Sequence, residues 1–131
     1  MPWSGILVVG GGAAVGAWIR WGLGIALNPL FPTLPLGTLA ANLAGGFLMG
    51  VAMELLGRHA VLAPEMRLLV TTGFLGGLTT FSTFSAEVTT LLMRKEYLWG
   101  SIAIAGHVVG SVALTVIGMM LARALYAWAP A

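Results

Sequence analysis

The stretch GFLGGLTTFSTFS, residues 73–85, interrupts an otherwise apolar segment and decides how this chain folds. Two adjacent glycines followed by threonines make a poor helix interior, because glycine costs ~1 kcal/mol relative to alanine there. The sequence is apolar on both sides of this stretch, from about residue 64 to about residue 93. We therefore predict a long helix over 64–93 that is broken near its middle, at 76–79.

Three further apolar segments lie outward from this one, over about 5–27, 36–56 and 97–126. Each provides the ~20 residues that a helix needs to cross the hydrocarbon core of a bilayer. Of the 131 residues, 59% are hydrophobic and only 8% are charged, which is far too little charge for a soluble surface. The sequence thus predicts an all-α integral membrane protein with four transmembrane helices, in a single transmembrane domain over 1–131.

Composition excludes several other classes of protein. The chain has no cysteine, so it forms neither a disulfide nor a thiolate metal site. Its six basic side chains are too few for a nucleic-acid patch. No lysine or arginine precedes the first apolar run, which is also longer than the apolar region of a signal peptide, so we expect it to be a retained helix.

Glycines separated by four residues recur in three of the predicted helices. In lipid this spacing allows helix backbones to approach closely, so we assign these glycines to helix packing. The run of glycines at 10–12 lacks the full spacing and the preceding strand of a nucleotide-binding loop. The three pairs are Gly12 and Gly16, Gly46 and Gly50, and Gly106 and Gly110.

Polar side chains repeat along one face of two predicted helices. Thr38 and Asn42 are four residues apart, and His107, Ser111 and Thr115 form a stripe ~12 Å long at 1.5 Å per residue. Polar groups in lipid need partners, so these residues either join helices or line a path. Neutral donors without an acidic ring favour an anion or a small neutral solute over a cation.

The predicted break adds a second polar feature at mid-membrane. Backbone groups without helical partners persist at that depth only when they are buried in protein or line a cavity, where they can bind ions. Phe81 and Phe84 are three residues apart and project from about the same helix face. They serve either ordinary packing or the ion path.

The motifs in this order resemble those of the Fluc (CrcB) family of fluoride channels. Residues 73–87, GFLGGLTTFSTFSAE, are similar to the signature of that family's third helix. GTLAANLAGG at 37–46 and GAWIRW at 16–21 resemble its second and first helices. The resemblance implies a fluoride-specific channel that passively exports fluoride from the cytoplasm, lowers its toxicity and lies in the inner (plasma) membrane of the cell as a multi-pass protein.

The resemblance also implies an antiparallel, dual-topology homodimer with two fluoride pores and one structural sodium ion that is not transported. Phe81 and Phe84 would turn the positive edges of their rings toward fluoride, and Asn42 would donate its amide. Backbone carbonyls of Gly76 and Thr79 from both subunits would hold the sodium. The other implied site residues are Thr38, Ser111 and Thr115 along a polar track, Arg20 at an aqueous vestibule, and Glu87 in contact with pore hydroxyls or water.

Two interpretations of His107 stay open, because some members of the family carry serine at this position. A neutral imidazole can donate one hydrogen bond into the pore. A structural histidine would instead bond to a neighbouring helix.

The main rival function is a proton-coupled small-solute exporter of the small multidrug-resistance type, which needs a carboxylate in its cavity. Glu54 and Glu96 lie at helix ends, so only Glu87 could serve. A non-transporting assembly subunit would explain neither the polar stripes nor the break. We do not expect an enzyme, because no acid completes a triad with His107 and Ser111. The expected partners are fluoride, the bilayer and a second copy, with neither nucleic acid nor another protein.

Basic residues are balanced between the two predicted sides of the membrane. With this balance the positive-inside rule has no bias to act on, so each copy should insert in either orientation. Two opposed copies could then pair about a two-fold axis in the membrane plane. One side carries Arg58, Arg67 and Arg123, and the other carries Arg20, Arg94 and Lys95.

Overall fold

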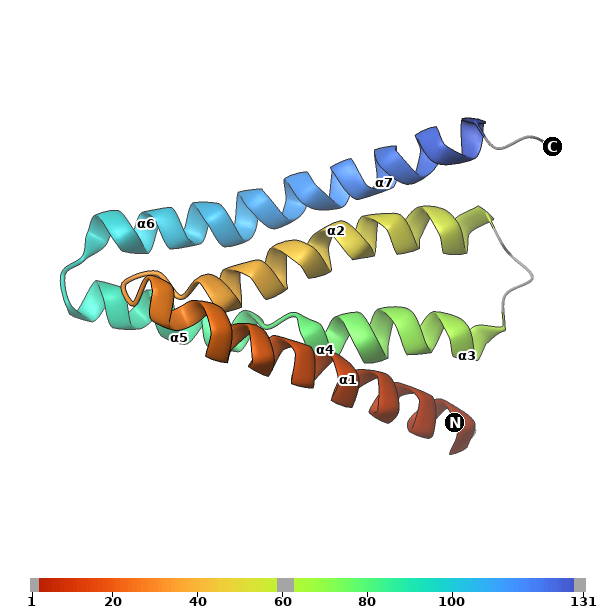
Figure 1. Ribbon diagram of the computed structural model, residues 1–131, viewed down its shortest axis with the longest axis horizontal. Helices are drawn as coiled ribbons and strands as arrows, with labels where there is room; N and C mark the ends of the chain where they lie inside the picture. The colour runs from red at the N-terminus through yellow and green to blue at the C-terminus, as the bar shows by residue number, and fades with distance from the viewer. Residues whose placement is uncertain (1–2, 59–62, 129–131) are drawn as a thin grey trace.

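The structure, a computed structural model, describes residues 3–58 and 63–128, and every regular element in them is helical. The helices lie side by side with their long axes roughly aligned (Figure 1). The start of α1 and the end of α7 lie at the same end of the bundle, as an even number of crossings requires (Figure 1). In chain order the elements are α1 (Trp3–Leu27), η1 (Asn28–Leu30), α2 (Leu36–Arg58), α3 (Pro64–Arg67), η2 (Leu68–Leu75), α4 (Gly76–Leu78), α5 (Phe81–Met93), α6 (Tyr97–Ala105), η3 (Gly106–Gly110) and α7 (Ser111–Trp128).

Three helical stretches in the described part of the chain are long and apolar enough to cross a membrane. Each contains one of the unbroken helices predicted from the sequence and extends slightly beyond it. The fourth predicted crossing, over 64–93, runs beside them as the shorter elements α3 to α5 (Figure 1). The prediction of an all-helical membrane protein is therefore confirmed. The three stretches are Trp3–Leu30, Leu36–Arg58 and Tyr97–Trp128.

The break in the third crossing lies at Thr79 and Thr80, at the C-terminal edge of the predicted interval 76–79. The helix continues through α4, and the N–H of Thr79 still donates to the carbonyl of Leu75 at 3.0 Å. Thr79 and Thr80 then adopt extended conformations, with ψ of 156° and 117°. The prediction placed the start of the break at Gly76, whereas Gly76–Leu78 are helical in the structure and Gly77 packs against the backbone of Ala13 in α1.

That packing brings the backbone of α1 against the backbone of η2 and α4. A Cβ added at Gly12 would lie 2.8 Å from the carbonyl oxygen of Leu69, and one at Gly16 would overlap backbone atoms of Phe74 and Leu78. Backbones approach this closely only where the facing residues are small. The predicted packing role of the first glycine pair is confirmed.

The other two glycine pairs differ from each other. A Cβ at either Gly46 or Gly50 would overlap the backbone of α7, so this pair also permits close packing, here between α2 and α7. The glycines of the third pair, in η3, face leucine side chains of α2 rather than its backbone. The leucines separate the two helices at that level, so the predicted close backbone approach does not occur there.

We expect Gly16→Ala to destabilise the bundle by about 1–3 kcal/mol, the usual cost of an extra methyl group in a closely packed site. The matched control is Gly22→Ala on the same helix, where a Cβ would have no neighbour within 4 Å. That control should be neutral or slightly stabilising, because alanine favours helix over glycine. Thermal unfolding of both variants in detergent measures the difference, and equal melting temperatures would contradict the packing role.

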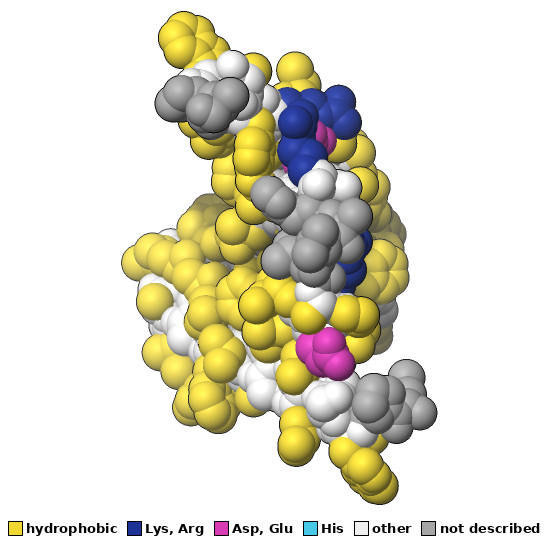
Figure 2. Space-filling model, turned by 90° about the vertical axis from the view of Figure 1, so that its right-hand side faces the viewer, with side chains coloured by type: hydrophobic (Ala, Val, Ile, Leu, Met, Phe, Trp, Pro, Cys, Tyr) yellow, Lys and Arg dark blue, Asp and Glu magenta, His cyan; other side chains and the backbone are white. Residues whose placement is uncertain are grey.

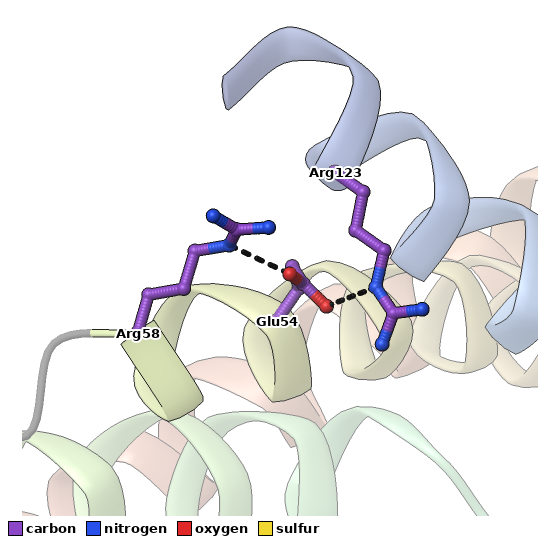
Figure 3. Close-up of polar contacts among 3 residues, drawn as sticks. All are labelled: Glu54, Arg58 and Arg123. Atoms are coloured by element: carbon purple, nitrogen blue, oxygen red, sulfur yellow. Dashed lines mark hydrogen bonds and ion pairs between the residues drawn. The ribbon is translucent and has the colours of Figure 1, made fainter. Parts of the chain in front are cut away.

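Charged side chains gather at the end of the bundle where α1 begins and α7 ends (Figure 2). Glu54 of α2, only 9% exposed, bonds with one carboxylate oxygen to Nε of Arg58 and with the other to Nε of Arg123, each at 2.6 Å (Figure 3). Because Arg123 belongs to α7, this carboxylate links the C-terminal end of α2 to the C-terminal part of α7. A buried carboxylate needs such partners to remain charged.

Candidate functional site

The side chain of Asn42, on α2, occupies the break in the third crossing. Its Oδ1 accepts from the backbone N–H of Thr80 at 2.7 Å, and its Nδ2 donates to the carbonyl oxygen of Thr80 at 3.0 Å. The break leaves the N–H of Thr80 without a helical partner, and Oδ1 of Asn42 supplies one. The carbonyl of Thr80, the N-cap of α5, receives Nδ2 of Asn42 as an additional donor. Because a backbone N–H only donates and a carbonyl only accepts, the two bonds fix which way the amide points.

An aromatic cluster lies next to this amide. His107 of η3 places Nδ1 2.9 Å from Nδ2 of Asn42, and its ring stacks on that of Phe84 with centroids 4.5 Å apart. Phe81 meets Phe84 edge to face, at 5.4 Å and 72°. Phe84 and His107 are buried, whereas Phe81 is 76% exposed. The two phenylalanines therefore form one contact pair that extends from the protein interior to its surface.

A cavity of about 420 Å³ adjoins the break, between the third crossing and the faces of α2, η3 and α7. Its polar lining consists of hydroxyls, one amide and one imidazole, and no carboxylate belongs to the lining within the described residues. Eight of the residues predicted for the site line it together: Asn42, Gly76, Thr79, Phe81, Phe84, His107, Ser111 and Thr115.

A second cavity, of about 310 Å³, contains two more of the predicted residues, Arg20 and Thr38. Nε of Arg20 donates to the carbonyl of Gly77 at 3.1 Å, which brings a positive charge from α1 to the level of the break. The hydroxyl of Thr38 donates to Oε1 of Glu87 at 2.6 Å. Thr80 lines both cavities, so the Asn42–Thr80 bridge lies between them.

The hydroxyls of α7 are directed at backbone atoms of α2. Thr115 donates to the carbonyl of Gly46 at 2.9 Å and is also 2.9 Å from that of Ser111. Ser111 lies 3.5 Å from the carbonyl of Asn42, a long and weak bond. The polar stripe thus lines the cavity and joins two helices, although the sequence suggested these roles as alternatives.

Thr80 is the residue that the sequence analysis missed. Its backbone carries both bonds to Asn42, and its hydroxyl caps α5 by accepting from the N–H of Thr83 at 3.2 Å. A threonine immediately before the first residue of a helix is an N-cap signal, and it could have placed the break at this position.

Helices long enough to span a bilayer, a break within the third crossing and, beside it, a cavity with uncharged polar groups in a largely apolar lining define a multi-pass membrane protein with room for a small solute or ion at the break. The family model described as "CrcB-like protein, Camphor Resistance (CrcB)" matches residues 7–119. The chain belongs to this family.

Curated relatives named "Fluoride-specific ion channel FluC" align over almost the whole chain. The chain is 57% identical to that of Nitrosospira multiformis over 118 residues, which are 90% of this chain and 92% of the relative. It is 58% identical to that of Tolumonas auensis over 114 residues, 87% of this chain and 90% of the relative. The protein of Ralstonia pickettii is 54% identical over 123 residues, 94% of this chain and 98% of the relative.

Proposed function

We propose that this protein is a fluoride-specific channel that lets fluoride leave the cytoplasm passively and so lowers its toxicity. The observation that carries the proposal is the 420 Å³ cavity at the helix break, lined by neutral hydrogen-bond donors and aromatic rings without a carboxylate among the described residues. Relatives that are more than half identical to the chain bear the name of such a channel.

The chemistry of the cavity suits a small anion. Fluoride holds its water strongly, so a narrow path must replace that water with close donors. Phe81 and Phe84 both belong to the lining and contact each other edge to face. Aromatic ring edges carry partial positive charge, and in this proposal an edge that is not used in the ring pair faces the ion. A carboxylate in the same place would repel the ion, whereas the cation of Arg20 in the adjoining cavity attracts it.

A proton-coupled exporter is not favoured by the same geometry. That mechanism requires a carboxylate that exchanges its proton with substrate inside the cavity. Glu87, the one candidate, accepts the hydroxyl proton of Thr38 and is not part of either cavity lining within the described residues. We therefore propose no coupling of fluoride movement to protons.

The functional unit in this proposal is an antiparallel homodimer. Phe81 and Gly76 both line the cavity and both are exposed, so the cavity wall reaches the protomer surface at the break. A second copy laid against this surface would cover Phe81 and close the path. Basic residues at both ends of the bundle, Arg58 and Arg123 at one and Arg94 and Lys95 at the other, support insertion in either orientation.

A structural sodium ion belongs to the same proposal, and the backbone at the break fits it. The N–H of Thr80 donates to Asn42 rather than to the carbonyl of Gly76, which an unbroken helix would pair with it. Thr79 is extended, so its carbonyl also leaves the helical pattern. Gly76 and Thr79 would hold the cation through these carbonyls, and the ion would supply positive charge to oxygens that lack donors. It would not be transported.

Liposomes that contain the purified protein test the function. With fluoride and chloride both inside the liposomes and an electrode for each anion outside, we expect fast fluoride efflux and almost no chloride efflux. The fluoride rate should not change when a protonophore removes the proton gradient. Equal release of both anions, or loss of fluoride flux with the proton gradient, would contradict a passive fluoride-specific channel.

A further inference from the structure

Two arginines share the carboxylate of Glu54 at the end of the bundle where α1 begins and α7 ends (Figure 3). Arg58 and Arg123 each donate to it through Nε. A guanidinium group carries further N–H donors on its two terminal nitrogens. Among the described residues, no carboxylate or carbonyl accepts from the terminal nitrogens of these two arginines. Each arginine therefore has donors that remain available to a ligand.

These donors are accessible and restrained. The side chains of Arg58 and Arg123 are 47% and 58% exposed, whereas that of Glu54 is 9% exposed. Cζ of Arg58 also lies 5.2 Å from the ring centroid of Tyr126, close enough for a cation–π contact. Side chains that are already held in place lose less conformational entropy when they bind a ligand. With two guanidinium groups and one carboxylate, the cluster has an excess of one positive charge, and dark blue side chains are visible on this end face (Figure 2).

The cluster lies at the level of the lipid headgroups. Helix α2 has 23 residues and ends at Arg58, so it is ~34 Å long and exceeds the ~30 Å hydrocarbon core of a bilayer. Trp3 begins α1 and Trp128 ends α7 at the same end of the bundle, and they are 81% and 89% exposed. Exposed tryptophans are typical of the boundary between lipid and water. The anionic groups nearest to the cluster in a membrane are therefore lipid phosphates.

We propose that Arg58 and Arg123 bind the phosphate group of an anionic phospholipid, and that Glu54 fixes the two guanidinium groups for this contact. The planar edge of a guanidinium group matches two oxygens of a phosphate, and hydrogen bonds between such charged groups are strong. An anionic lipid such as phosphatidylglycerol complements the excess positive charge of the cluster. Neither arginine is part of either cavity lining, so the inference does not depend on which ion passes through the protein.

The double variant Arg58→Lys/Arg123→Lys tests the site without changing the charge at either end of the bundle. Lysine can still pair with Glu54, so the variant should fold, but it lacks the planar edge of arginine. Arg94→Lys is the matched control, because Arg94 is exposed at the opposite end and no carboxylate holds it within the described residues.

Native mass spectrometry of the purified proteins with added phosphatidylglycerol measures binding. We expect the double variant to bind this lipid about tenfold more weakly than the unsubstituted protein, and Arg94→Lys to bind it equally well. Equal binding by all three proteins, or an equal loss in Arg94→Lys, would overturn the proposal.

Thermal unfolding in detergent separates lipid binding from a purely structural role of the arginines. Phosphatidylglycerol should raise the melting temperature of the unsubstituted protein, because a ligand that binds only the folded state stabilises it. It should raise that of the double variant much less, whatever the two melting temperatures are without lipid. An equal rise in both proteins would mean that the arginines serve only to neutralise Glu54, and it would overturn the proposal.

Two other additions define the ligand. Phosphatidylcholine carries the same phosphate beside a quaternary ammonium group, and we expect it to bind several-fold more weakly because the arginines repel that cation. Inorganic phosphate at the same concentration as phosphatidylglycerol should leave the lipid bound, because it lacks acyl chains that pack on the apolar helices. Equally tight binding of phosphatidylcholine would contradict the choice of an anionic lipid. Displacement by inorganic phosphate would identify a site for a free anion and overturn the assignment to a lipid.

Discussion

Asn42→Asp is expected to lower fluoride flux by about two to three orders of magnitude. Two like charges about 4 Å apart repel each other by ~4 kcal/mol at an effective dielectric constant of about 20, which corresponds to roughly a thousandfold. The substitution also removes both amide donors. Flux from liposomes, compared at equal amounts of protein, measures the effect.

The aspartate keeps an oxygen at the place where Asn42 accepts the N–H of Thr80, so the bundle should still fold. Asn28→Asp is the matched control, because Asn28 likewise accepts a backbone N–H through Oδ1, that of Gly37, at 2.8 Å. It lines the smaller cavity together with Arg20, whose charge offsets a carboxylate there. We expect the control to lose far less flux. Equal flux in both variants would place the ion path away from the helix break.

Forcing one membrane orientation is the second change for which we expect a very large effect, close to complete loss of fluoride export. Two or three lysines added at the C-terminus would give the end that carries Arg58 and Arg123 a clear excess of positive charge, and the positive-inside rule would then retain that end in the cytoplasm. An antiparallel dimer cannot form from copies that all face the same way.

Coexpression provides the control for this experiment. A version with lysines added beside Arg94 and Lys95, at the opposite end of the bundle, should be inactive by itself for the same reason. The two versions expressed together should restore fluoride resistance in cells that lack their own exporter. Full activity from either version alone would rule out the antiparallel arrangement.

Much of the fold could be predicted from the sequence because a bilayer imposes simple rules. The lengths of the apolar segments gave the crossings, and glycine spacing identified two of the close helix contacts. The position of the break could not be read in the same way. Glycine weakens a helix, yet Gly76 and Gly77 are both helical, and Gly77 packs against the backbone of α1. The break comes instead where Asn42, 38 residues away in the chain, forms hydrogen bonds with the backbone N–H and carbonyl of Thr80.

In the site, too, helical spacing along the chain predicted some features, whereas contacts between different helices determine others. Helical spacing placed His107, Ser111 and Thr115 on one face, and all three line one cavity. Spacing also paired Thr38 with Asn42, but Thr38 lines the adjoining cavity instead and donates its hydroxyl to Glu87. Which hydroxyls are already bonded, and which nitrogen of an imidazole carries the proton, depends on partners in other helices, and no spacing rule supplies them.

The reversal potential of the current in a planar bilayer tests passive fluoride selectivity most directly. The solutions contain a fluoride gradient, equal chloride on both sides and a separate pH gradient. The equilibrium potentials of fluoride, chloride and protons then differ, so the zero-current voltage shows which ion the pore conducts. A passive fluoride-selective pore should reverse at the fluoride equilibrium potential, whatever the pH on either side. A reversal potential that follows chloride or protons, or a bilayer without current at any voltage, would contradict it.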